Sequence, residues 1–270
     1  MLKTQVYEGV TQIMMGREVE GTVYYWTSAY LVEGLLVDSG CSYTAEELVG
    51  FLRRRRVDRL VNTHHHEDHV GGNALIKREL GVGGLAHAKA IPLIKSRLPL
   101  HSYQELVWGY PEPSQARPVP EIIETKSCCF QVLDTPGHSP DHLALFEPER
   151  GWCFCGDLFV SEDQKTLRAD EDIFGIAASL RRLLELPGER LVLFTAIGRI
   201  FPEGRSAVRA YLDHLARLQA RVQELKEKGF SPEAIRDEIF QRESRLAELT
   251  GGHFSILNLV RQLMDDTRQV

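Results

Sequence analysis

The feature that most limits how this chain can fold is a run of metal-binding side chains, His64-x-His66-x-Asp68-His69. It follows a short apolar segment, DRLVNT at 58–63, which predicts a buried strand that ends in a glycine-bearing loop. Neutral imidazoles and carboxylates are ligands that Zn²⁺ and Fe²⁺ accept. Clustering them without a cation would bury unpaired polar groups at a cost of several kcal/mol each. We therefore predict a metal site at the end of this strand rather than a chance polar loop.

Composition places the chain among globular proteins without crosslinks. Of its 270 residues, 43% are hydrophobic and 26% charged, and the net charge is −6. An acidic chain offers no general attraction to nucleic acid or to an anionic membrane, so we expect neither as a partner. No apolar run reaches the roughly 20 residues of a membrane span. The five cysteines and the absence of a signal-peptide pattern in MLKTQVYEGV lead us to expect a cytoplasmic protein.

The order of the predicted elements indicates one mixed body followed by a helical region. Strand-like runs fill 21–38 and return from residue 121, with helical segments between and after them. The proline-rich stretch 92–120 predicts an irregular loop or lid. Beyond Gly204 the pattern becomes helical. We therefore predict an α/β body at 1–204 and a C-terminal helical region at 205–270.

The helix expected after Gly204 carries a heptad-like apolar seam. The seam consists of Val208, Tyr211, Leu215, Leu218, Val222 and Leu225. Such spacing could form a coiled-coil homodimer through residues 208–225. A seam of about two and a half repeats more often packs on its own domain, and we favour that interpretation.

Two later segments have the same placement at predicted strand ends: DTPGHSPDH at 134–142 and CGDLF at 155–159. With the first histidine run, they resemble the metallo-β-lactamase fold hydrolases, in particular the glyoxalase II-like and lactamase-beta-2-like branches. The resemblance covers roughly residues 20–200. It implies an α/β (α+β) protein built as an αββα sandwich, with metals held at one edge between the two sheets.

The resemblance also implies a role for each matching residue. The ligands of a first metal would be His64, His66 and His138; those of a second would be Asp68 and His69, with Asp157 bridging both. A hydroxide between the metals would be the nucleophile, and Asp68 would act catalytically by orienting it or taking its proton. Asp38 matches a supporting acid of the family. His142 is either a supporting hydrogen-bond partner or an ordinary strand histidine.

One position departs from the family pattern. The family usually closes the second metal site with a histidine in a turn after the last strand, and here that turn places Ile197 at the expected position. Isoleucine cannot bind metal. The second site is then weaker, or another side chain completes it, or the chain has kept the fold and changed its function. His253 is the only obvious substitute, although a histidine at a helix start that contacts the body is the favoured interpretation.

These features favour a metal-dependent hydrolase of a small carbonyl substrate, such as a thioester, ester or lactone. Zn²⁺ is the expected cofactor, as one or two ions, and iron or manganese would also suit the ligands. Two alternatives stay open. One is a binding or regulatory protein with an altered metal site, which Ile197 suggests. The other is a phosphodiesterase or nuclease of the same superfamily, which the net acidity disfavours.

Overall fold

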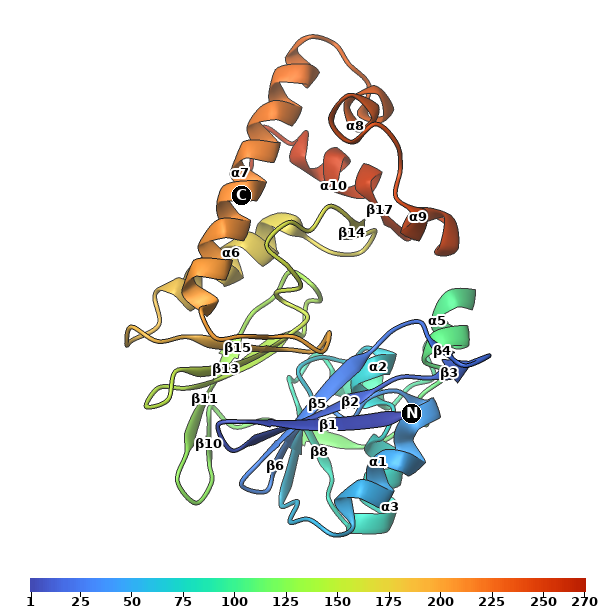
Figure 1. The fold of residues 1–270 in the computed structure, drawn as a ribbon, viewed down its shortest axis with the longest axis vertical. Coiled ribbons are helices and arrows are strands. Elements are labelled where there is room, and N and C mark those ends of the chain that lie inside the picture. Colours follow the sequence, from blue (N-terminus) through green and yellow to red (C-terminus); the bar gives the residue numbers. More distant parts are fainter.

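A computed structural model describes residues 1–270 and shows two sheets that face each other, with helices on both outer sides (Figure 1). The first sheet has the order β1 (Leu2–Tyr7), β2 (Val10–Met15), β5 (Thr27–Val32), β6 (Leu35–Val37), β7 (Arg59–Val61), β8 (Gly84–Ala86) and β9 (Ala116–Pro118). The second has the order β10 (Ile122–Glu124), β11 (Cys129–Asp134), β12 (Leu143–Glu147), β13 (Trp152–Gly156), β15 (Val192–Thr195) and β16 (Ile200–Phe201). A short hairpin joins β3 (Glu18–Val19) to β4 (Thr22–Val23).

Alternation along the central strands explains why both faces of the second sheet are buried. On β13, Trp152 and Phe154 point into the core between the sheets, where they meet side chains of the first sheet such as Tyr30. Cys153 and Cys155 point the other way, into the core beneath the outer helices. Successive strand residues face opposite sides, so a strand covered on both sides is apolar throughout. These two cysteines are small core residues.

Helices complete the four layers. The amphipathic helices α1 (Ala45–Leu52) and α3 (Asn73–Leu80) cover the outer face of the first sheet. The outer face of the second sheet is covered by α6 (Ile173–Leu184) and the long α7 (Gly204–Glu227). The predicted αββα architecture is therefore confirmed.

The stretch 92–120 is not the irregular loop that its prolines predicted. It contains part of α4 (Ile91–Ile94), all of α5 (Ser102–Val107) and strand β9. Proline is compatible with these elements because Pro92 lies in the first turn of α4 and Pro118 lies on an edge strand.

Three helices follow α7: α8 (Pro232–Phe240), α9 (Arg245–Leu249) and α10 (Ile256–Leu263). All six residues of the heptad-like seam are buried in one cluster with residues of α6, α8 and α10. The seam therefore packs within its own chain, and pairing with a second copy would require it to be exposed. Because this cluster also includes residues of β12 and β13, the division of the chain at residue 204 stays a prediction.

The C-terminal region is joined to the sandwich by a two-stranded ladder. Strand β14 (Leu167–Arg168) pairs with β17 (Phe254–Ser255), and the Ala169 amide donates to the His253 carbonyl at 2.9 Å. On α10, the Gln262 side chain donates to the Glu171 carbonyl at 2.6 Å. Figure 1 shows β14 and β17 where the helical region meets the sandwich.

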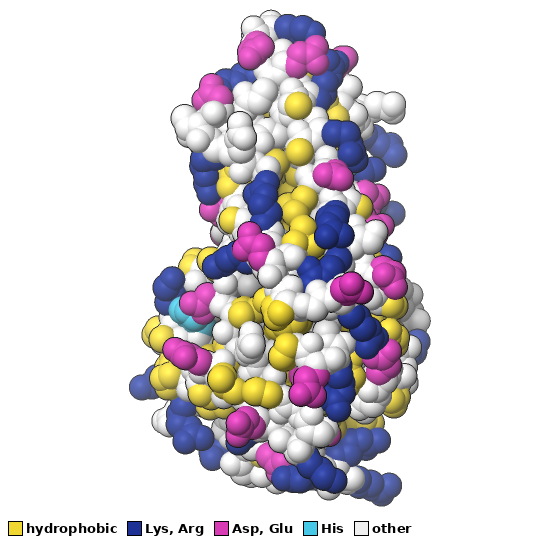
Figure 2. All heavy atoms as spheres, turned by 90° about the vertical axis from the view of Figure 1, so that its left-hand side faces the viewer, with side chains coloured by type: hydrophobic (Ala, Val, Ile, Leu, Met, Phe, Trp, Pro, Cys, Tyr) yellow, Lys and Arg dark blue, Asp and Glu magenta, His cyan; other side chains and the backbone are white.

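The surface facing left in Figure 1 carries charges of both signs. Figure 2 shows Lys and Arg side chains mixed with Asp and Glu over the helical region and the sandwich. None of the helices combines the length and the apolar character needed to cross a bilayer.

Candidate metal centre

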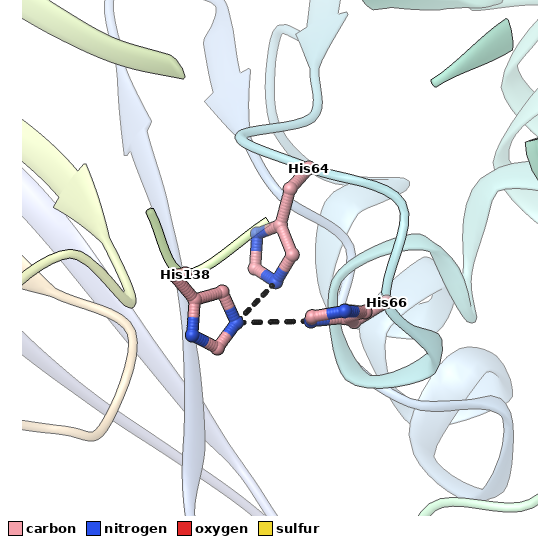
Figure 3. Close-up of side chains that lie close together, drawn as sticks. All are labelled: His64, His66 and His138. Carbon is pink, nitrogen blue, oxygen red and sulfur yellow. Dashed lines mark hydrogen bonds between the residues drawn. The ribbon is translucent and has the colours of Figure 1, made fainter. Parts of the chain in front are cut away.

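Three histidines meet at the edge where both sheets end. His64 and His66 follow β7 of the first sheet, and His138 follows β11 of the second. The His138 Nε2 atom lies 3.2 Å from His64 Nε2 and 2.9 Å from His66 Nδ1 (Figure 3). Burial, and then the neighbouring histidines, lower the pKa of His64. The His64 ring is therefore neutral, and neutral imidazoles are ligands for a divalent cation.

A second group adjoins the first and shares His64 with it. His64, His69 and Asp157 have ligand atoms within 4.8 Å of one another. One Asp157 oxygen lies 3.4 Å from His69 Nε2 and 3.5 Å from His138 Nε2, so this carboxylate faces both groups. His69 Nε2 and Asp157 Oδ1 are buried and have no hydrogen-bond partner. Because unpartnered buried polar atoms are costly, this donor set fits a bound cation.

Asp68 lies beside this second group, on the single turn of α2 (Glu67–Val70). One of its carboxylate oxygens is 3.7 Å from His69 Nε2. Burial raises the pKa of Asp68 to about 7, Asp157 adds to the rise, and His69 opposes it. This turn packs closely against the backbone at Ser42 because the next residue is Gly71. A Cβ at this position would lie 2.3 Å from the Ser42 nitrogen.

Asp38 and His142 support the cluster from behind. Asp38 accepts a hydrogen bond from His69 Nδ1 at 2.8 Å and from the Thr63 amide at 2.7 Å. This contact fixes the proton on Nδ1 and leaves Nε2 free to face Asp157, the supporting role that the resemblance implied. His142 bonds the Thr135 hydroxyl at 2.8 Å and accepts from the Asp157 amide at 3.3 Å. It therefore holds the backbone of Asp157 rather than joining the cluster.

Sequence reasoning missed two residues that contact the histidines. Glu171 accepts a hydrogen bond from His138 Nδ1 at 2.6 Å, and its other oxygen accepts the Arg168 amide at 2.7 Å. The Arg168 guanidinium lies against His66, with Nη2 2.7 Å from Nε2. No local pattern marks either residue, because Arg168 lies on a two-residue strand that pairs with the C-terminal region and Glu171 lies in the turn that follows it.

The structure does not bring His253 into the cluster. Its Nδ1 accepts from the Tyr103 hydroxyl at 2.7 Å, its Nε2 lies 3.5 Å from Asp170, and its ring stacks on His101. Ile197 is half-buried in the turn between β15 and β16. The adjacent Ala196 amide donates to the Gly156 carbonyl at 3.0 Å, so this turn lies next to Asp157.

A cavity of about 160 Å³ opens beside the three-histidine group. Its walls come mainly from residues between 93 and 111, from Asp170 in the turn after β14, and from the C-terminal region through His253. His66 and Arg168 are both among its lining residues. The cavity therefore reaches the three-histidine group at His66.

A helix-flanked pair of sheets with a buried histidine and carboxylate cluster at their shared edge defines a metal-binding α/β protein. Residues 27–195 match the model of the metallo-beta-lactamase superfamily, and the chain belongs to that superfamily. The resemblance found in the sequence is thereby confirmed. Family and relatives also support the predicted class of metallo-hydrolase.

Similar proteins include curated hydrolases and solved structures. A hydroxyacylglutathione hydrolase of Legionella pneumophila (strain Paris) is 29% identical over 142 residues, which are 51% of this chain and 48% of that protein. The chain thus spans about half the length of such curated relatives. A solved structure, TTHA1623 in a di-iron-bound form, is 29% identical with a TM-score of 0.54, covering 68% of this chain and 94% of that one.

One similar fold includes the C-terminal helices. The metallo-beta-lactamase family protein TTHA1429 from Thermus thermophilus has a TM-score of 0.62 at 19% identity, covering 96% of this chain and 92% of that one. At this identity the likeness shows the fold alone.

Proposed function

We propose that this protein is a metal-dependent hydrolase of a small thioester, ester or lactone. The observation that carries the proposal is the buried cluster in which His69 Nε2 and Asp157 Oδ1 have no hydrogen-bond partner, beside a cavity open to a small molecule. Similarity to hydroxyacylglutathione hydrolases favours the thioester among these substrates.

The ligands divide between two ions. The first ion would be held by His64, His66 and His138, and the second by Asp68 and His69, while Asp157 faces both groups. With Ile197 in the closing turn, the second ion would have three protein ligands, the number that catalytic zinc sites usually have. Zinc is the proposed metal, and the di-iron form of a similar protein makes iron the first alternative to test.

The protein's own groups orient the ligands and move the proton. Bound metal would lower the pKa of a water molecule and stabilise negative charge on the substrate carbonyl oxygen. Asp38 and Glu171 accept the outward protons of His69 and His138, which turns the opposite nitrogens of both rings inward. Asp68, 3.7 Å from His69 Nε2, would accept the proton of the attacking water.

Metal content and turnover measured together test this proposal. Elemental analysis of untagged protein should find about two equivalents of metal, or about one if the second site is weak. Purified protein should hydrolyse members of a thioester and lactone panel, and His66→Ala should lose metal and turnover together.

Two alternatives predict different results. A binding or regulatory protein would hold metal but turn over nothing, and its ligand affinity could survive His66→Ala. A phosphodiesterase would cleave bis(4-nitrophenyl) phosphate and leave the thioesters intact. A chain that neither contains metal nor takes it up on reconstitution would contradict the hydrolase. Cytoplasmic location and the expected lack of nucleic-acid and membrane partners stay predictions.

A further inference from the structure

We propose that Arg168 anchors a carboxylate of the substrate, so that the substrate is an acid-bearing thioester, ester or lactone. This inference rests on the proposed function for the identity of the scissile bond. It adds the chemical class of the substrate, which neither the family nor the ligand set specifies.

Arg168 combines burial with access to the cavity. Its side chain is 7% exposed, yet it lines the cavity together with His66. Asp170 occupies one edge of the guanidinium, accepting from Nε at 2.6 Å and from Nη2 at 2.8 Å. On the other edge, both contacts are with His66: Nη1 lies 3.4 Å from Nδ1 and Nη2 lies 2.7 Å from Nε2. This edge of the buried cation thus has the His66 ring as its only acceptor.

The nitrogen at 3.4 Å faces the cluster. His66 Nδ1 lies 2.9 Å from His138 Nε2, so Nδ1 is the atom turned toward the proposed first metal. If Nδ1 binds metal, the neutral ring carries its proton on Nε2, so it has no lone pair left for Arg168 and turns a donor toward Nη2. The guanidinium then requires a different acceptor, and the cavity is where an acceptor can enter. A carboxylate matches the two parallel N–H bonds that an arginine fork offers.

Neighbouring groups hold the guanidinium in place. Asp170 is itself held by His253 Nε2 at 3.5 Å, and His253 is held by the Tyr103 hydroxyl at 2.7 Å. The Asp170 side chain is 58% exposed, so solvent screens its charge more than that of Arg168. The cavity also contains Glu67, which accepts a hydrogen bond from Gln104 at 2.8 Å.

The first test is a binding measurement that requires no turnover. Calorimetry on zinc-loaded protein would compare glutarate with pentanoate, and succinate with butanoate. In each pair one carboxylate can reach the metal, and only the diacid has a second one for Arg168. We expect the diacid to bind about tenfold more tightly or better, as charged hydrogen bonds predict. Equal affinities in both pairs would overturn the inference, and this measurement needs no variant to fold.

Variants then assign the preference to one residue. Arg168→Gln should reduce the diacid preference to within about twofold, and Arg168→Lys should keep part of it because lysine retains charge but not the fork. The matched control is Arg97→Gln, since Arg97 is an exposed lining residue stacked on Tyr110. Loss of the preference in Arg97→Gln with retention in Arg168→Gln would refute the assignment. Zinc content of each variant confirms that the cluster is intact.

Turnover separates this inference from the proposed function. Glutaryl and pentanoyl thioesters of N-acetylcysteamine differ only in the terminal carboxylate. A kcat/KM at least tenfold higher for the glutaryl thioester, with this preference lost in Arg168→Gln, supports both proposals. Equal hydrolysis of the two thioesters overturns the carboxylate anchor but still supports the proposed hydrolase activity. Hydrolysis of neither, with a diacid preference in calorimetry, contradicts the thioesterase and supports the anchor.

Discussion

Replacing Glu171 with glutamine should weaken the first metal site without removing any ligand. Glu171 and His138 are both buried, and the carboxylate accepts two hydrogen bonds, from His138 Nδ1 at 2.6 Å and from the Arg168 amide at 2.7 Å. A glutamine has the same shape but only one oxygen. Whichever way the amide is turned, its NH₂ group faces one of these donors.

The cost follows from this donor-to-donor contact. An unsatisfied buried donor costs about 1–3 kcal/mol, and loss of the charge on the acceptor weakens the bond that remains. If the amide keeps the His138 contact, the cost appears in folding stability. If it keeps the Arg168 contact, the His138 ring is freed to rotate, and metal affinity falls by about 10–100-fold, as for other partners of ligating histidines.

A competition titration against a chromophoric zinc chelator measures the affinity directly, and urea unfolding of the metal-free protein measures stability. Glu185→Gln is the control, because Glu185 is exposed at the end of α6 and its replacement removes the same charge. Zinc affinity and stability both unchanged in Glu171→Gln would refute the reasoning that this carboxylate orients His138.

Three further predictions concern other parts of the site and fold. Ile197→His should tighten the second metal, which titration of the second equivalent would show; unmoved metal content and activity would mean that the missing ligand belongs elsewhere. Gly137→Ala should destabilise the protein by about 3 kcal/mol or more, because φ is +142° and a Cβ would lie 2.2 Å from the Ile176 nitrogen. Gly50→Ala, with nothing near its Cβ, should be neutral or slightly stabilising in the same urea assay. Burial lowers the pKa of His142 to about 3, against about 6.5 unfolded. The unfolded chain therefore binds the extra proton first, and metal-free protein should lose on the order of 5 kcal/mol as pH falls from about 6.5 to 3. His142→Gln should flatten this acid limb, and an unchanged slope would contradict the assignment.

The parts of the site that the sequence predicts are formed by residues in short motifs at the ends of strands. His64 to His69 form one string at the end of a buried strand, and His138 and Asp157 stand at the ends of two others. Strand ends of a sandwich meet at one edge, so short motifs suffice to predict which side chains the fold brings together. Strands β12 and β13 are apolar and buried at nearly every position, and their successive residues enter the two cores on either side of the sheet.

The parts that sequence did not predict depend on contacts between distant segments. Arg168 and Glu171 gain their positions from a two-residue strand that pairs with Phe254 and Ser255, and no periodicity marks so short a strand. The proline-rich stretch 92–120 misled in the opposite direction, because Pro92 and Pro118 occupy the few positions where helices and edge strands accept proline.

The β14–β17 ladder couples the C-terminal helices to the histidine cluster. Arg168 of β14 contacts His66, Glu171 in the turn after β14 contacts His138, and Gln262 of α10 donates to the backbone carbonyl of Glu171. Coupling of this kind is reciprocal, because a free energy shared between two events has the same value from either side. We therefore expect metal that rigidifies the histidines to raise the free energy of local opening of residues 254–263, and opening of these residues to lower metal affinity by the same factor. The last helix of the chain would then contribute to metal affinity without supplying a ligand.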